Sequence, residues 1–255
     1  MSDIFLSVVI PAYNEEVNIR SGVLTQVEDY LKSKDYTWEV LIADDGSNDK
    51  TVEVADQFCQ KHKGFNVLKE PHRGKGGTVI AGVLAANGKY ILFTDADQST
   101  PINQLEKFLP LLKSDYDIVI GSRSGREGAP IFRKLMSLGF SLIRTILLRL
   151  PYKDTQTGFK AFRREPARKV FGLMKRFFEN KHIKGASTAA GFDVEMLYIA
   201  RKMGYKIAEV PVDWVYEPGT KKNPLKESWI GFRGVMAVRI KSLLGVYKIK
   251  NEKNT

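Results

Sequence analysis

The stretch Tyr90-Ile91-Leu92-Phe93-Thr94-Asp95-Ala96-Asp97-Gln98 joins an apolar run directly to two carboxylates. The apolar run predicts a buried strand over 90–94, and the acidic pair then lies where that strand ends at the edge of a sheet. Carboxylates at positions i and i+2 can direct oxygens at one Mg²⁺ or Mn²⁺ ion, which prefers oxygen ligands and keeps open positions for substrate phosphates. Two acids in a surface turn usually only solvate a loop, so this interpretation depends on the rest of the chain.

The first half of the chain repeats this pattern of short apolar runs separated by helical patterns. We expect strands at 6–10, 39–43, 66–69, 90–94 and 117–120. Helices are expected at about 17–31, at 50–62 with Asn48 or Asp49 as the cap, and at 78–86 after a glycine loop. The alternation predicts an α/β fold with a mostly parallel sheet and flanking helices, in which ligands bind beyond the carboxyl ends of the strands.

The second half contains two amphipathic helical patterns. After a loop at 124–131, apolar residues recur with helical spacing over 132–150, and a second pattern with a basic polar side runs over 225–247. Neither offers the roughly 20 consecutive apolar residues that cross a bilayer. Each predicts either a helix at a membrane surface, with Lys and Arg at the headgroups, or a helix packed on the protein's own core.

The net charge of +11 is unevenly divided along the chain. Residues 1–125 carry 13 Lys and Arg against 18 Asp and Glu, whereas residues 126–255 carry 27 against 11. A second half this basic indicates an anionic partner, either nucleic acid or lipid phosphate at a membrane surface. The sequence has no docking motif for nucleic acid and no interleaving of basic and aromatic residues, so no nucleic-acid partner is expected.

The remaining composition narrows the setting of the protein. Cys59 is the only cysteine, so no internal disulfide can form, and the three histidines lack metal-ligand spacing. The chain enters its first strand without a targeting pattern, and the single cysteine fits a reducing compartment; the expected location is cytoplasmic. We expect a catalytic domain over 1–215, including the helix at 132–150, and a C-terminal basic amphipathic helix with a polar tail over 216–255.

Polar residues follow two further predicted strands. Tyr13 can stack on a nucleobase, and Glu15 can accept a hydrogen bond from a ribose hydroxyl. Asp44 can accept an N–H from a base edge, or it can simply shape the turn into the next helix. Lys75, in the glycine-rich segment 73–77, offers a cation and neighbouring backbone N–H groups to a diphosphate. Placed on successive strands of one sheet, these residues indicate a nucleotide site.

Ordered motifs over about residues 5–245 resemble a known family. They are the segments 6–15 (LSVVIPAYNE), 44–47 (DDGS), 73–77 (RGKGG), 95–97 (DAD), 121–123 (GSR), 154–160 (DTQTGFK), 192–197 (FDVEML), 211–214 (PVDW) and 217–221 (EPGTK). On these motifs the chain resembles the inverting family 2 glycosyltransferases, which have the GT-A fold. Among them it is most similar to the polyprenyl-phosphate glycosyltransferases, with the dolichyl-phosphate β-glucosyltransferases first and the dolichyl-phosphate mannose synthases next.

The resemblance assigns expected roles to individual residues. It implies nucleotide binding by Pro11, Tyr13, Glu15, Asp44 and Asp95, to which Lys75 is added from its own position. It implies a Mg²⁺ or Mn²⁺ ion on Asp97, with Asp95 nearer the sugar and Gln98 as an added oxygen ligand. It implies phosphate binding by Arg123, Arg133 and Lys221, and an acceptor-loop motif at Asp154, Gln156 and Lys160. The expected catalytic set is Asp95, Asp97, Arg123 and Asp154. Ser99 departs from the family, because related mannose synthases often have Gln there.

The function implied is transfer of a hexose from a nucleotide sugar to the phosphate of dolichol or another polyprenol, at the cytoplasmic face of a membrane. UDP-glucose is the favoured donor, and GDP-mannose stays open. A phosphomonoester carries about −1.5 to −2 charge at pH 7, so it is nucleophilic without a base. A soluble family 2 transferase acting on a sugar hydroxyl is an alternative, and it requires a carboxylate base such as Asp154, Asp193 or Glu195.

Two further family features bear on membrane attachment. Eukaryotic glucosyltransferases of this kind carry an N-terminal membrane helix, so in this chain we expect the amphipathic helices to provide a peripheral attachment. Processive polysaccharide synthases carry several membrane spans and a Q-x-x-R-W motif, and the sequence has neither. Polymer synthesis is therefore not expected.

Overall fold

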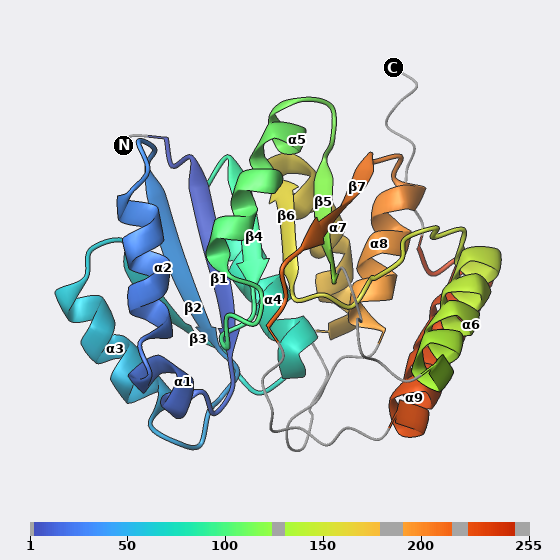
Figure 1. The fold of residues 1–255 in the computed structure, drawn as a ribbon, viewed down its shortest axis with the longest axis horizontal. Helices are drawn as coiled ribbons and strands as arrows, with labels where there is room; N and C mark the ends of the chain where they lie inside the picture. The colour runs from blue at the N-terminus through green and yellow to red at the C-terminus, as the bar shows by residue number, and fades with distance from the viewer. Residues whose placement is uncertain (1–2, 124–130, 179–190, 216–223, 248–255) are drawn as a thin grey trace.

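The computed structural model describes residues 3–123, 131–178, 191–215 and 224–247, without the side chains of 131–138 and 224–228. Within these residues, seven strands form one sheet in the order β3-β2-β1-β4-β6-β5-β7 (Figure 1). The strands are β1 (Leu6–Ala12), β2 (Trp38–Asp44), β3 (Phe65–Lys69), β4 (Tyr90–Thr94), β5 (Ile118–Arg123), β6 (Phe159–Arg163) and β7 (Ile207–Val212). Neighbouring strands pair in parallel except β6, which is antiparallel to both β4 and β5. The predicted α/β fold with a mostly parallel sheet is confirmed.

Helices cover both faces of this sheet (Figure 1). One face carries α1 (Glu16–Arg20), α2 (Val23–Lys32), α3 (Thr51–Lys61), the 3₁₀ helix η1 (Ile102–Lys107) and α5 (Leu109–Lys113). The other carries α4 (Gly74–Ala85), α7 (Arg164–Phe178) and α8 (Phe192–Lys202). The helices α6 (Ile131–Leu148) and α9 (Pro224–Leu243) lie side by side at the end of the molecule away from β3 (Figure 1).

Alternating side chains of the strands build a core on each face. In β1, Val8 and Ile10 pack on the side of α2, whereas Val9 packs on the side of α4. In β4, Leu92 packs on the side of α2 and Phe93 on the side of α4. Strands buried on both faces are continuous apolar runs, which is typical of parallel sheets covered by helices. The acidic turns therefore stand out in the sequence where these runs end.

The reversed direction of β6 brings a distant loop to the carboxyl edge of the sheet. Because β6 is antiparallel, the residues before Phe159 lie beside the end of β4, where Thr94 pairs with Phe159. The backbone N–H of Asp95 donates to the carbonyl of Gly158 at 3.1 Å. The sequence motif at 154–160 thus reaches the acidic turn through strand direction.

Two predicted helices have different bounds in the structure. The helix expected at 17–31 is divided into α1 and α2, because Gly22 adopts a φ of 95°, in the left-handed region that favours glycine. The segment 73–77 is not a loop, since α4 begins at Gly74 and the glycines form its first turn. The predicted loop at 124–131 falls on residues outside the description up to 130, and the predicted tail at 250–255 lies outside it entirely.

The first turn of α4 is glycine-rich because other helices pack closely on it. A Cβ at Gly76 would lie 2.8 Å from the ring of Phe178 in α7 and 2.9 Å from that of Phe192 in α8. A larger residue would push both helices away from α4. The packing partners are far away in the sequence, so the glycines alone predict a loop at this position.

In the described half of α6 an arginine is buried, whereas two residues of the predicted apolar stripe are exposed. Arg144 is 2% exposed, and its guanidinium donates to the carbonyl of Tyr152 and, at 3.0 Å, to Ser141 Oγ. Leu142 and Ile146, which belong to the predicted apolar stripe, are 61% and 69% exposed. These two residues do not pack on the core, so core packing, one of the two alternatives left open by the sequence, does not hold for the whole stripe. An arginine can be buried because it satisfies a carbonyl of the following loop.

A buried carboxylate joins α9 to α8. Glu195 is buried and accepts hydrogen bonds from Lys241 Nζ at 2.7 Å and Tyr247 Oη at 2.6 Å. On its other side α9 contacts α6, where Gly231 lies against the ring of Phe140. The described part of α9 is therefore packed on the α/β body, while the expected domain boundary at 215 stays a prediction.

Candidate functional site

The acidic turn after β4 carries two carboxylates with different partners. Asp95 Oδ1 forms an ion pair with Lys75 Nζ from the first turn of α4. Asp97 Oδ1 accepts a hydrogen bond from the backbone N–H of Ser99 at 2.9 Å. Burial lowers the pKa of Lys75, but the charges of Asp95 and Asp193 more than offset this, so that its pKa is raised. The ammonium group is therefore retained beside Asp95 at neutral pH.

Gln98 completes this turn in a way that suits a metal ion. It adopts a φ of 49°, and its Nε2 donates to the carbonyl of Asp95 at 2.9 Å. Its Oε1 is buried and has no hydrogen-bond partner among the described residues. An unpaired amide oxygen beside two carboxylates fits the oxygen ligands of a hard divalent cation. The described residues contain no group of three His, Cys, Asp or Glu side chains that could hold a metal, so such a cation would also need water or substrate oxygens.

Glu15, after β1, faces the same acidic turn. Burial raises the pKa of Glu15, and the charges of Asp97 and Asp95 raise it further. The ends of β1 and β4 therefore bring three carboxyl groups within electrostatic reach of one another, as predicted for strand ends on one edge of a sheet.

Tyr13 lies in a flat stack with His72. The two ring centroids are 4.4 Å apart and the planes differ by 14°. The ring nitrogen Nδ1 of His72 lies 2.9 Å from Asp45 Oδ2, and Asp45 Oδ1 accepts from the backbone N–H of Arg73 at 2.8 Å. The sequence does not predict this stack, because it depends on two loops that only the fold brings together.

Asp44 is fully engaged in its own turn. Its Oδ2 accepts from the backbone N–H groups of Gly46 at 3.0 Å and Ser47 at 3.1 Å, and its Oδ1 accepts from Ser47 Oγ at 2.5 Å. This is the turn-shaping arrangement anticipated as the alternative, and nucleobase binding by Asp44 stays a prediction. Pro11 is buried in β1, in register with Ala43 of β2.

Arg123, at the end of β5, is held by a two-pronged ion pair. Its Nε lies 2.6 Å from Asp154 Oδ2 and its Nη2 lies 3.1 Å from Asp154 Oδ1. Burial raises the pKa of Asp154, but the Arg123 guanidinium outweighs this and, with other hydrogen bonds, brings it to about 2. The guanidinium also lies 5.5 Å from the ring centre of Trp214, after β7. The backbone N–H of Gln156 donates to the same carboxylate at 3.1 Å, so the 154–156 turn is fixed to β5.

Lys160 is fully buried, which the sequence did not predict. Its Nζ donates to Asp193 Oδ1 at 2.7 Å and to the carbonyl of Thr157. Its ammonium group therefore does not face solvent as a ready phosphate ligand. The side chains of Arg133 and Lys221, the other predicted phosphate ligands of the second half, lie outside the described residues.

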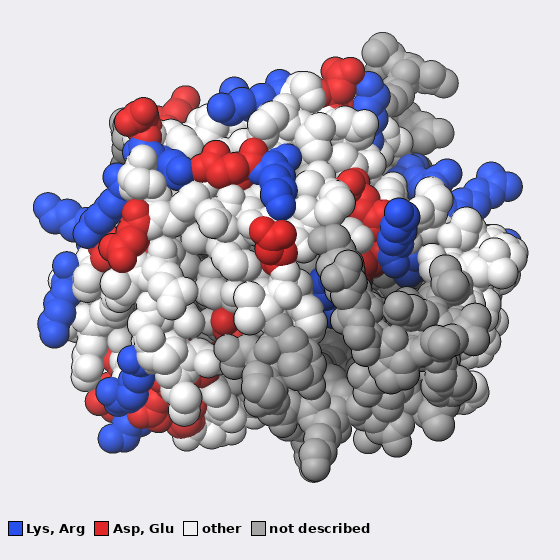
Figure 2. Space-filling model, viewed as in Figure 1, with Lys and Arg blue, Asp and Glu red and all other residues white. Residues whose placement is uncertain are grey.

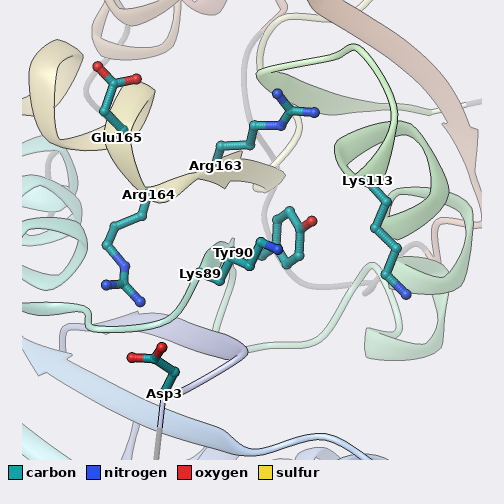
Figure 3. A pocket seen from close by; sticks show the side chains of 7 residues that line it. All are labelled: Asp3, Lys89, Tyr90, Lys113, Arg163, Arg164 and Glu165. Carbon is teal, nitrogen blue, oxygen red and sulfur yellow. The ribbon is translucent and has the colours of Figure 1, made fainter.

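A pocket of about 550 Å³ lies at the opposite edge of the sheet (Figure 3). It is lined by Asp3, Lys89, Tyr90, Lys113, Arg163, Arg164 and Glu165. Tyr90 begins β4 and Arg163 ends the antiparallel β6, so the pocket opens at the amino ends of the parallel strands. Nε of Arg163 donates to the carbonyl of Leu112 and Nε of Arg164 to that of Gly88, each at 2.8 Å. These arginines connect the end of β6 and the start of α7 to α5 and to the turn before β4, and the pocket is separate from the acidic turns.

Exposed apolar residues mark the end of the molecule formed by α6 and α9. We call them the α6/α9 apolar surface: Leu142, Ile143, Ile146, Trp229, Ile240, Leu243, Leu244 and Val246. No helix among the described residues is long and apolar enough to cross a membrane. On the face shown in Figure 2, acidic and basic side chains are interspersed over the end that carries α2 and α3.

Comparison with known proteins gives one family and one fold. The family model described as glycosyl transferase family 2 matches residues 7–171. A dolichyl-phosphate β-glucosyltransferase of Dictyostelium discoideum is 35% identical, over 98% of this chain and 79% of that protein. Its human counterpart is 34% identical, over 96% of this chain and 78% of that protein.

A solved structure shares the architecture at lower sequence identity. Mannosyl-3-phosphoglycerate synthase from Rubrobacter xylanophilus superimposes with a TM-score of 0.66 at 17% identity, over 99% of this chain and 78% of that one. At this identity the likeness concerns the fold alone, which is the GT-A fold. The sequence relatives and the family model go further: the chain belongs to glycosyl transferase family 2 and is a glycosyltransferase.

Proposed function

We propose that this enzyme transfers glucose from UDP-glucose to the phosphate of dolichol or another polyprenol, with inversion at the anomeric carbon. The likeness to dolichyl-phosphate β-glucosyltransferases over nearly the whole chain supports these substrates. One structural observation carries the proposal. The loop that resembles the acceptor motif lies directly against the acidic turn, where Asp95 donates to the carbonyl of Gly158. A donor held at the acidic turn and an acceptor held by this loop would therefore meet.

The proposed reaction needs positive charge more than it needs a base. An acceptor phosphate oxygen attacks the anomeric carbon, the bond from that carbon to the diphosphate oxygen breaks, and UDP leaves with the electron pair. No proton has to be removed from the acceptor, because the phosphomonoester is already an anion at neutral pH. Lys75 and Arg123 bring cations to this edge of the sheet, where they can stabilise the two anionic substrates.

A divalent metal is part of the proposal. Asp97 and the unpaired Oε1 of Gln98 would hold it, and when bound it would neutralise the charge that develops on the leaving diphosphate. A structure of glucosyl-3-phosphoglycerate synthase from Mycobacterium tuberculosis, 23% identical with a TM-score of 0.57, contains Mn²⁺ together with UDP. Mg²⁺ or Mn²⁺ is therefore the cation to supply in any assay.

The acceptor is a lipid, so the enzyme must reach a membrane surface. We propose a peripheral association through the α6/α9 apolar surface, with the cytoplasmic face as its location. Apolar side chains of an interfacial helix can enter the boundary between headgroups and acyl chains, while neighbouring Lys and Arg meet anionic lipids. Arg149 and Arg233, both exposed, lie on or next to these helices.

A donor panel tests the proposal. The enzyme is incubated in detergent or vesicles with labelled UDP-glucose or GDP-mannose, polyprenyl phosphate and Mg²⁺ or Mn²⁺. We expect UDP-glucose to give a product that enters the organic phase and is labile to mild acid. Product from GDP-mannose alone would replace glucose by mannose, and transfer only to sugar hydroxyls would favour the soluble alternative. The absence of a lipid-linked product with every donor would refute the proposal.

A further inference from the structure

The candidate site contains a carboxylate that the proposed reaction does not need. Asp193 lies in the first turn of α8, and its side chain is 20% exposed. In a family 2 enzyme acting on a hydroxyl, a carboxylate at this edge could remove the acceptor's proton. For a phosphate acceptor, the carboxylate of Asp193 is unfavourable for two reasons. An anion at this position repels the incoming phosphate, and it can activate water against the donor.

Lys160, in β6 between β4 and β5, contacts this carboxylate. It is in register with Phe93 of β4, its side chain is fully buried, and its Nζ lies 2.7 Å from Asp193 Oδ1. The carbonyl of Thr157 accepts from the same ammonium group, so its position is set from two sides. A fully buried ammonium is costly unless it is paired, which means that the pair forms as part of folding.

The pair lies next to the acidic turn. The Nζ atoms of Lys160 and Lys75 lie 5.2 Å and 5.9 Å from the ring centre of the same residue, Phe93. Lys75 is the residue whose ammonium contacts Asp95. The charge of Asp193 also reaches Lys75 and Arg123, since it contributes to raising the pKa of each. Asp193 therefore lies among the groups proposed to hold the donor and acceptor.

We propose that Lys160 is a positioning residue that masks Asp193, and that this masking makes the site selective for an anionic acceptor over water. The inference rests on the proposed transfer to a lipid phosphate. In the masked state, an oxygen of Asp193 is occupied by the ammonium and its charge is balanced, so a phosphate can approach. In the unmasked state, Asp193 accepts a proton from water while the water oxygen attacks the anomeric carbon. The bond to the diphosphate then breaks, and free glucose and UDP result.

Lys160→Met is the direct test, because methionine keeps the apolar stem and removes the charge. Two quantities are measured: UDP release from UDP-glucose without acceptor, and the KM for polyprenyl phosphate in the transfer reaction. We expect UDP release to rise by about tenfold or more, as an added general base allows. We also expect the KM for the acceptor to rise by about tenfold, because Asp193 without its ammonium partner is an uncompensated anion that repels the acceptor phosphate.

The double variant Lys160→Met/Asp193→Asn separates masking from a merely structural role. It lacks the carboxylate, so both quantities should return toward their wild-type values. Lys169→Met, which breaks an exposed pair with Glu165 on α7, is the matched control and should leave both unchanged. If Lys160→Met does not fold, as judged by its melting temperature and UDP binding, Lys160→Gln replaces it with the same expected directions.

Two results would overturn the inference: no increase in UDP release in a folded single variant, or an increase that persists in the double variant. Failure of the proposed function would give a different experimental result. In that case the wild-type enzyme itself forms no lipid-linked product with any donor, whereas the hydrolysis comparison between the variants still gives an answer.

Discussion

Gly158 shows how closely the two halves of the candidate site approach each other. A Cβ at this residue would lie 1.9 Å from Asp95 Oδ2, so the Asp95 carboxylate would have to leave the position in which it pairs with Lys75. The glycine therefore allows the loop before β6 to touch the acidic turn after β4. At the residue scale, the site depends on this contact as much as on the charged groups around it.

Gly158→Ala should reduce transfer by roughly 100-fold, since a displacement of about 1 Å in a catalytic site has effects of that size. Initial rates with UDP-glucose and polyprenyl phosphate measure this. Gly172→Ala, in α7 with nothing within 4 Å of the added methyl group, is the matched control and should retain full activity. An active Gly158→Ala enzyme would show that the contact with Asp95 is unimportant.

A second prediction at the residue scale concerns how much Asp154 contributes to the stability of the fold. Its pKa is about 2 in the folded protein against an ordinary value of 3.8, and its side chain is only 12% exposed. The depressed pKa means that the ion pair with Arg123 stabilises the fold above about pH 4, and that this contribution is lost as the pH falls through about 2. A shift of this size corresponds to about 2–3 kcal/mol in the free energy of unfolding.

Urea unfolding of Asp154→Asn at several pH values checks this. The variant should be less stable than the wild type at pH 7, and the difference should shrink between pH 4 and pH 2. Asp115→Asn is the control, because Asp115 is 84% exposed and should show no such trend. A difference that is the same at every pH would mean that the ion pair does not stabilise the fold.

At the scale of single elements, the helices α6 and α9 are the proposed membrane contact. Both are packed on the body, through Arg144 and Glu195 respectively, yet each leaves large apolar side chains exposed. Among them Ile146 and Leu243 are 69% and 70% exposed. Burying such side chains in a lipid interface is favourable by about 1.5–3 kcal/mol each. The arrangement thus combines the two options left open by the sequence, packing on one side and exposure on the other.

Ile146→Glu combined with Leu243→Glu should weaken binding to vesicles that contain anionic lipid by at least about tenfold, because two apolar contacts are lost and two negative charges are added. Flotation with vesicles measures the effect. The control is Val17→Glu, in α1, which is also well exposed at 78% but lies at the other end of the sheet. Equal flotation of wild type and the double variant would exclude this surface as the membrane contact.

At the scale of the whole molecule, the sequence predicted the fold class and the edge of the sheet that carries the site. The apolar runs of β1 and β4 are local signals, and the acidic turns follow them directly, so periodicity and chain order were sufficient. The strands β6 and β7 were not predicted, and the antiparallel direction of β6 depends on its neighbours in the sheet. The contact between Asp95 and Gly158 follows from that direction and was missed for the same reason.

The other unpredicted features are also long-range. Lys160 was expected to act in the acceptor-loop motif, but its partner Asp193 comes from the start of α8 and is brought to it only by the packing of that helix. Arg144 is buried because the carbonyl of Tyr152 lies beside α6. The spacing of apolar residues along the sequence contains no information on which distant residue pairs with Lys160 or with Arg144. The roles of the predicted site residues in substrate binding stay predictions.

The central claim, glucosyl transfer to a phosphate with inversion, is tested most directly by the structure of the product. The enzyme is supplied with UDP-glucose labelled with ¹³C at the anomeric carbon, polyprenyl phosphate and Mn²⁺, and the organic phase is examined by NMR. The account predicts an anomeric ¹³C signal coupled to ³¹P in the β configuration. Label found only in free glucose, on a hydroxyl group, or in the α configuration would contradict it.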